Sequence, residues 1–179
     1  MLSAMKITAE VLIEAPASAA WSVLGDCWAH IGLWAAPITS SSVDGELLAG
    51  TVRTCHTARF GPVAPGVIKE RLLEFDPAGR CFTYESIDGM PGFIKRAVNH
   101  WSILPLDDGR CVVRSEATVE LRGPMVLLSF VLARSFKANG ARVFEELRHR
   151  VEHGVPHPRK VAAMRRDPGL AGLVSHGPC

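Results

Sequence analysis

The sequence lacks the features by which membrane-spanning and nucleic-acid-binding chains are recognised. Its longest apolar stretch, residues 125–133 with Ser129 inside it, is far shorter than the roughly 20 residues that cross a bilayer. The 20 Lys and Arg residues are nearly balanced by 18 Asp and Glu residues, and no segment concentrates basic side chains. We therefore expect no stable membrane insertion and no nucleic-acid partner.

A secretory leader and a cysteine framework are also missing. The N-terminus has no basic start, long apolar run or small-residue cleavage site, so a cytoplasmic location is expected. The cysteines are odd in number, widely separated and never paired as CxxC, which argues against a disulfide framework and a zinc knuckle. We interpret them as reduced thiols, most of them packing groups: Cys27, Cys55, Cys81, Cys111 and Cys179.

Sequence motifs for cofactors and metals are absent too. The chain contains no HExxH, GxSxG, P-loop or GxGxxG motif, so the sequence predicts no cofactor. His149 and His153 have the i, i+4 spacing of two metal ligands on a helix, but they lie opposite Leu147 and Val151, on the side expected to face water. We therefore interpret them as solvated histidines near a helix C-terminus and predict no metal site.

What the chain does contain suits one globular domain. With 179 residues, of which 47% are hydrophobic and 21% charged, it can bury a sizeable core but not two full domains. We expect the folded domain to span residues 1–154. The Pro/Gly-rich remainder, residues 155–179, is expected to form a mostly disordered tail.

The order of predicted elements is that of an α+β fold. Period-two alternation over residues 7–13 predicts a first strand, and two short helices follow near residues 16–24 and 28–34. Turn residues then separate six strand-like runs: residues 43–48, 51–57, 67–75, 81–87, 93–104 and 111–122. Pro124 opens a long helix with one apolar side. We predict a seven-stranded antiparallel sheet curved around this C-terminal helix.

The last predicted strand indicates that only one face of the sheet is exposed to solvent. In residues 111–122, apolar and small side chains alternate with Arg, Glu and Thr. Small residues on the expected inner side, such as Ala97, Ser115, Ala117 and Gly140, suggest that helix and sheet leave a void between them. We expect this void to hold a small, largely apolar molecule.

Three short motifs accompany this order of elements: Ala-Pro-Ala-Ser-Ala-Ala-Trp at 15–21, Gly-Thr-Val-Arg at 50–53 and Glu-Arg-Leu-Leu-Glu-Phe-Asp at 70–76. Over about residues 5–153 the chain resembles the START-like (SRPBCC) superfamily of polyketide cyclases/dehydrases and lipid-transport proteins. Members of this superfamily share the helix-grip fold with the birch-pollen allergen. Within the superfamily, the chain looks most like the branch of plant abscisic-acid receptors and their bacterial relatives.

The resemblance implies roles for particular residues. It places Glu70 where the receptors carry a cavity carboxylate, and Asn139 where they carry a polar residue on the long helix. Residues 60–65 correspond to a mobile gate loop and residues 88–92 to the loop that faces it. Because residues 43–48 contain no counterpart of the receptors' cavity lysine, we expect a ligand other than an acidic hormone.

Polar residues on the expected dry face are the candidates for chemistry. Alternation buries Glu70, and two interpretations stay equally open: it is a ligand-binding group or general acid/base, or it is the salt-bridge partner of Arg53. Tyr84 could orient a ligand oxygen or donate a proton. Asn99 points into the same apolar space and needs a hydrogen-bond partner there.

These considerations lead to one prediction of function with two alternatives. We predict a carrier or sensor, monomeric or homodimeric, for a small hydrophobic molecule that is lipid-like, aromatic or polyketide-like. The predicted ligand contacts are Trp34, Phe60, Pro62, Glu70, Phe82, Tyr84, Met90, Asn99, Trp101, Ser115, Asn139 and Val143. The first alternative is a polyketide cyclase/dehydratase-type enzyme in which Glu70, Tyr84 or Asn99 moves a proton. The second is a partner-binding protein that uses the apolar entrance and the tail.

Overall fold

The computed structural model describes residues 4–58 and 65–166. Its main feature is a seven-stranded antiparallel sheet with the strand order β1-β7-β6-β5-β4-β3-β2. The strands are β1 (Ala4–Ile13), β2 (Ile38–Val43), β3 (Val52–Thr57), β4 (Gly66–Asp76), β5 (Cys81–Asp88), β6 (Ile94–Asp107) and β7 (Arg110–Leu121). From β2 to β7, each strand pairs with the next one along the chain, so the predicted meander is confirmed.

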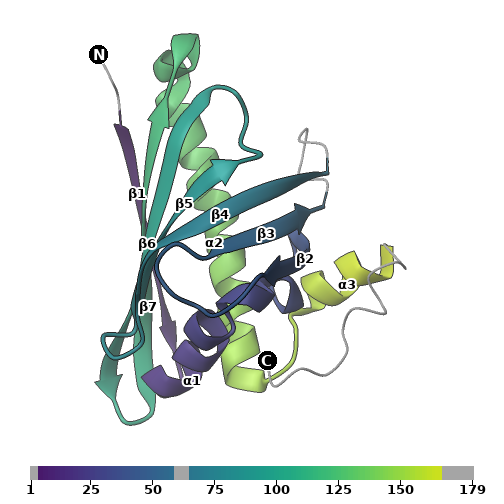
Figure 1. The fold of residues 1–179 in the computed structure, drawn as a ribbon. Helices are drawn as coiled ribbons and strands as arrows, with labels where there is room; N and C mark the ends of the chain where they lie inside the picture. The colour runs from purple at the N-terminus through teal and green to yellow at the C-terminus, as the bar shows by residue number, and fades with distance from the viewer. Residues whose placement is uncertain (1–3, 59–64, 167–179) are drawn as a thin grey trace.

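Helices cover the dry face of this sheet. They are α1 (Ala17–Trp21), the π-helix η1 (Ser22–Asp26), the 3-10 helices η2 (Trp28–Leu33) and η3 (Gly123–Leu128), α2 (Ser129–His153) and α3 (Pro158–Arg166). Figure 1 shows α2 running along one side of the curved sheet, with α1 near its lower end and α3 beside it. The predicted pair of short helices after the first strand and the long C-terminal helix are therefore confirmed.

The core lies between α2 and the sheet. On β7, burial follows the predicted alternation: Cys111 and Val113 are buried, whereas Glu116 is exposed. Phe144 of α2 stacks on Trp101 of β6, with ring centroids 5.1 Å apart. These contacts bury the apolar side of the helix, which supplies most of the driving force for its formation.

The prediction of a strand over residues 43–48 is wrong, because the second strand ends at Val43. Gly45 and Gly50 have φ values of +94° and +99°, a conformation that glycine adopts without strain and that strands do not contain. Thr51 Oγ1 donates a hydrogen bond to the Glu46 carbonyl at 2.7 Å and so closes the turn. The true strand, Ile38–Val43, contains three consecutive serines, which concealed its strand character.

The prediction of a mostly disordered tail is wrong for residues 158–166, which form α3. Proline suits the first turn of a helix, because the missing N–H would have no intrahelical partner there. The contacts of Arg159 and Lys160 with the domain hold this helix in place. The remainder of the predicted tail, residues 167–179, lies outside the described residues.

The prediction of reduced thiols agrees with the structure for three cysteines. Cys55, Cys81 and Cys111 are free thiols. Cys27 is disulfide-bonded, so the prediction of a reduced thiol is wrong there, and Cys179 lies outside the described residues. In residues 4–58 and 65–166, no helix combines the length and apolar character that a bilayer span requires.

Candidate ligand-binding site

Aromatic rings fill the centre of the fold. Phe82 lies between Tyr84 and Trp101, at centroid distances of 6.3 and 6.5 Å, and Trp28 lies 6.3 Å from Tyr84. Together with Trp34, these residues surround a void of only about 20 Å³. A space of this size holds about one water molecule. Four of the predicted ligand contacts therefore surround a space that has no room for an organic molecule.

Arg53 and Glu70 form an ion pair beside this aromatic cluster. The two residues face each other directly in the β3–β4 register, and Arg53 Nε donates to Glu70 Oε2 at 2.9 Å. Arg53 is 2% exposed and Glu70 13%. The guanidinium also lies 4.0 Å from the Trp28 ring centroid and donates to the Trp28 carbonyl. Of the two interpretations of Glu70, the salt bridge with Arg53 is present.

Electrostatics explain why the Arg53 guanidinium stays charged in a buried position. Burial lowers the pKa of Arg53, but the Glu70 carboxylate offsets this effect, so the pKa lies above its ordinary value. Burial, followed by the charge of Glu70, raises the pKa of Tyr84 to about 12. Burial likewise raises the pKa of the Cys55 thiol to about 12. At neutral pH, Tyr84 is therefore a neutral hydrogen-bonding group and Cys55 is a protonated thiol.

Asn99 has hydrogen-bond partners on the inner face of the sheet, as its predicted position requires. Its Nδ2 donates to Tyr84 Oη at 3.3 Å, and its Oδ1 accepts from Ser115 Oγ at 2.7 Å. Asn99 lies opposite Tyr84 in the β5–β6 register and opposite Ala117 in the β6–β7 register. The chain Tyr84–Asn99–Ser115 thus links three adjacent strands across the inner face of the sheet.

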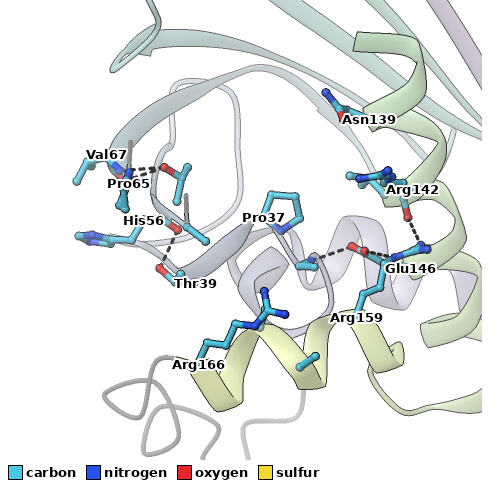
Figure 2. Close-up of a pocket in the computed structure, with 17 residues that line it drawn as sticks. Pro37, Thr39, His56, Pro65, Val67, Asn139, Arg142, Glu146, Arg159 and Arg166 are labelled. Atoms are coloured by element: carbon cyan, nitrogen blue, oxygen red, sulfur yellow. Dashed lines mark hydrogen bonds and ion pairs between the residues drawn. The ribbon is translucent and has the colours of Figure 1, made fainter. Parts of the chain in front are cut away.

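A much larger cavity, of about 1060 Å³, lies between the β2–β3 edge of the sheet, α2 and α3 (Figure 2). Its lining combines small apolar side chains with polar and charged ones. The lining residues are Ala36, Pro37, Thr39, His56, Thr57, Ala58, Pro65, Gly66, Val67, Asn139, Arg142, Val143, Glu146, Arg159, Ala162, Ala163 and Arg166. Asn139 and Val143 are the predicted ligand contacts among them.

A buried polar cluster attaches α3 to the floor of this cavity. Glu146 of α2 is 2% exposed and accepts hydrogen bonds from the Ala36 amide at 2.8 Å and from Arg159 Nε at 3.0 Å. Arg159 also pairs with Glu145 at 2.8 Å. Lys160 is 1% exposed and donates to the Ile38 carbonyl at 2.6 Å. Burial lowers the pKa of Lys160 to about 8, and the charge of Glu146 only partly opposes this shift.

The remaining predicted contacts lie elsewhere. Met90 packs with Ile94 in a second, smaller core cluster near the start of α2. Phe60 and Pro62 lie outside the described residues, as does most of the predicted gate loop over residues 60–65. The predicted site residues thus divide between the aromatic interior, the second cluster and the large cavity.

The cavity residues of α3 were not predicted from the sequence. Arg159, Ala163 and Arg166 lie in the segment 155–179, for which the sequence predicted a mostly disordered tail. A signal was available, because Pro158 is followed by eight residues without a glycine, all of which except Val161 have good helix propensity. In the described part of the chain, no group of three or more His, Cys, Asp or Glu side chains is arranged to hold a metal ion.

A family profile and a curated relative match the sequence. The profile of the family described as polyketide cyclase / dehydrase and lipid transport matches residues 4–152. The isoallergen Dau c 1.0401 of Daucus carota subsp. sativus is 30% identical over 91 residues, which make up 50% of this chain and 57% of the relative. The chain therefore matches less than two thirds of the length of that protein.

Two solved structures share the fold. The Zhui aromatase/cyclase from Streptomyces sp. R1128 is 19% identical, with a TM-score of 0.65 and coverage of 87% of this chain and all of that one (100%). Ara h 8.0201 is 14% identical, with a TM-score of 0.66 and coverage of 83% and 98%. At such low sequence identity, the two structures show only that the fold is shared. This shared fold confirms the predicted helix-grip architecture.

Proposed function

Because this chain belongs to the polyketide cyclase / dehydrase and lipid transport family, we propose that it binds a small hydrophobic molecule in the large cavity, as a carrier or sensor. The observation that carries this proposal is the cavity itself. Its volume of about 1060 Å³ lies just above the roughly 300–1,000 Å³ typical of ligand pockets. Burial of a ligand against its apolar walls is favourable by roughly 25 cal/mol per Å² of apolar surface.

The packing of the interior supports a ligand position under α3. The space among Phe82, Tyr84 and Trp101 is about 20 Å³, so an organic molecule would have to displace rings to enter it. The large cavity needs no such rearrangement. The ligand would lie against Pro37, Val143 and Ala163, with Asn139 as a hydrogen-bonding group.

The test uses the neutral fluorescent probe N-phenyl-1-naphthylamine. We expect its fluorescence to rise on binding to the wild-type protein. Ala163→Trp places a large ring in the cavity and should weaken binding at least about tenfold, equivalent to roughly 1.4 kcal/mol. Ala138→Trp is the matched control, because Ala138 is an exposed helical alanine outside the cavity lining. Equal binding by both variants would contradict a ligand site in this cavity.

A second candidate function is that of a cyclase or dehydratase. It is favoured by the Tyr84–Asn99–Ser115 chain, which provides neutral hydrogen-bonding groups at the wall of the interior. In this mechanism Glu70, Tyr84 or Asn99 would move a proton of a polyketide-like substrate. Native mass spectrometry of the purified protein after incubation with an aromatic polyketide distinguishes the two functions. An unchanged bound compound favours carriage or sensing, and a dehydrated product favours catalysis.

Three finer predictions belong to this proposal. They are the likeness to the abscisic-acid-receptor branch, the cytoplasmic location, and a monomeric or homodimeric state. The partner-binding alternative is tested by deleting residues 155–179. This deletion also removes α3. The pull-down experiments therefore include the Ala163→Trp variant, which fills the cavity but keeps α3, as a reference.

A further inference from the structure

The large cavity has a second chemical property besides its apolar walls: its charged rim is unbalanced. Three arginines line it, Arg142 from α2 and Arg159 and Arg166 from α3. Figure 2 shows Arg142 and Arg166 on different walls of the cavity. Of the described residues that line the cavity, Glu146 is the one acidic residue.

The acidic groups near the cavity are already occupied. Glu146 accepts from the Ala36 amide and from Arg159, and Glu145 pairs with the same arginine. Arg159 is therefore neutralised by two carboxylates and serves to attach α3. Among the described residues, no carboxylate lies within ion-pair distance of Arg142 or Arg166, and both are exposed.

Besides Arg142 and Arg166, the cavity lining presents apolar surface from Pro37, Val67 and Ala163. An apolar wall with two unpaired guanidinium groups complements a molecule with an apolar body and an anionic end. Guanidinium groups suit carboxylate and phosphate because their planar N–H groups can donate two parallel hydrogen bonds.

We infer that the ligand of this cavity is an amphipathic anion, whose carboxylate or phosphate group is bound by Arg142 and Arg166 and whose apolar part lies between β3, α2 and α3. This inference rests on the proposed function, because it names the ligand class of the same cavity. It also bears on the expectation of a ligand other than an acidic hormone, which followed in part from the missing lysine in residues 43–48. In the cavity the cations come instead from two helices, α2 and α3.

The experiment compares ligands of equal chain length by isothermal titration calorimetry: decanol, decanoate and decyl phosphate. We expect the wild-type protein to bind at least one of the anions tenfold or more tightly than decanol. Raising NaCl from 20 to 500 mM should reduce this preference, because salt screens exposed charges. Comparison of decanoate with decyl phosphate then distinguishes a carboxylate from a phosphate ligand.

The variant Arg142→Gln/Arg166→Gln should bind decanol as the wild type does and lose the preference for the anions. The substitution at Arg142 spares its carbonyl, which accepts from Arg159 Nη2 at 3.0 Å and helps to hold α3. Arg134→Gln is the matched control, since it removes an exposed arginine from α2 outside the cavity lining and should keep the preference. Thermal unfolding of all variants checks that they fold.

The outcomes separate this inference from the proposed function. Binding of decanol and the anions with equal affinity, or an anion preference that persists in the double variant, overturns the inference while the proposed function stands. Failure of decanol, both anions and N-phenyl-1-naphthylamine to bind overturns both.

Discussion

Removing the positive partner of the Arg53–Glu70 pair should destabilise the fold strongly. Arg53→Met leaves the Glu70 carboxylate, 13% exposed, without its cation, and it deletes the guanidinium that lies 4.0 Å from the Trp28 ring. Loss of one member of a buried pair costs about 3–5 kcal/mol, and a cation–π contact adds about 1 kcal/mol. Because Glu70 keeps some contact with water, we expect a loss of about 4 kcal/mol in the free energy of unfolding.

The assay is guanidinium chloride unfolding followed by tryptophan fluorescence, with thermal unfolding as a second measure. For a chain of this size, a loss of about 4 kcal/mol corresponds to a decrease of roughly 8–16 °C in Tm. Arg96→Met is the matched control, because Arg96 pairs with Glu85 at 2.9 Å but is 47% exposed. Its loss should cost less than about 1 kcal/mol.

The double variant Arg53→Met/Glu70→Leu tests whether the uncompensated Glu70 carboxylate causes the loss of stability. It removes both charges, so no uncompensated carboxylate remains, and we expect it to be at least about 2 kcal/mol more stable than additivity predicts. A cost below about 1 kcal/mol for Arg53→Met, or strict additivity in the double variant, would refute a structural role for the pair. Glu70 would then be available to a ligand or substrate.

Two further stability predictions concern Lys160 and Gly89. Burial lowers the pKa of Lys160 from 10.5 to about 8, so between these pH values the unfolded chain binds more protons and stability rises with pH. The free energy of unfolding, measured with urea from pH 7 to pH 10.5, should therefore rise for the wild type relative to Lys160→Met. A difference between the two proteins that stays constant over this pH range would contradict this prediction. Gly89 has φ +80°, and an added Cβ would overlap the Val67 carbonyl, so Gly89→Ala should cost about 2 kcal/mol. Gly92→Ala, with open space around its Cβ position, should leave Tm nearly unchanged, and equal Tm values for both variants would show that the loop relaxes.

Local patterns determined most of the architecture. Period-two burial on β7, turn residues between the strands and one apolar side of α2 are properties of short segments, because each follows from backbone geometry. Alternation also buries Glu70 on a strand next to the one that carries Arg53, so the sequence could predict this ion pair as one of two interpretations. It could also predict that Asn99 needs a partner on the inner face.

The location of the cavity depended on contacts between distant segments. Ala36 donates to Glu146 across 110 positions of sequence, and Lys160 donates to Ile38 across 122. Such contacts depend on how the curved sheet, α2 and α3 pack together, and no local pattern encodes them. The sequence by itself therefore determined a helix-grip domain with a polar pair and an aromatic interior. Only the tertiary structure decided that rings fill the interior, and that the large cavity lies under α3 beside Arg142 and Arg166.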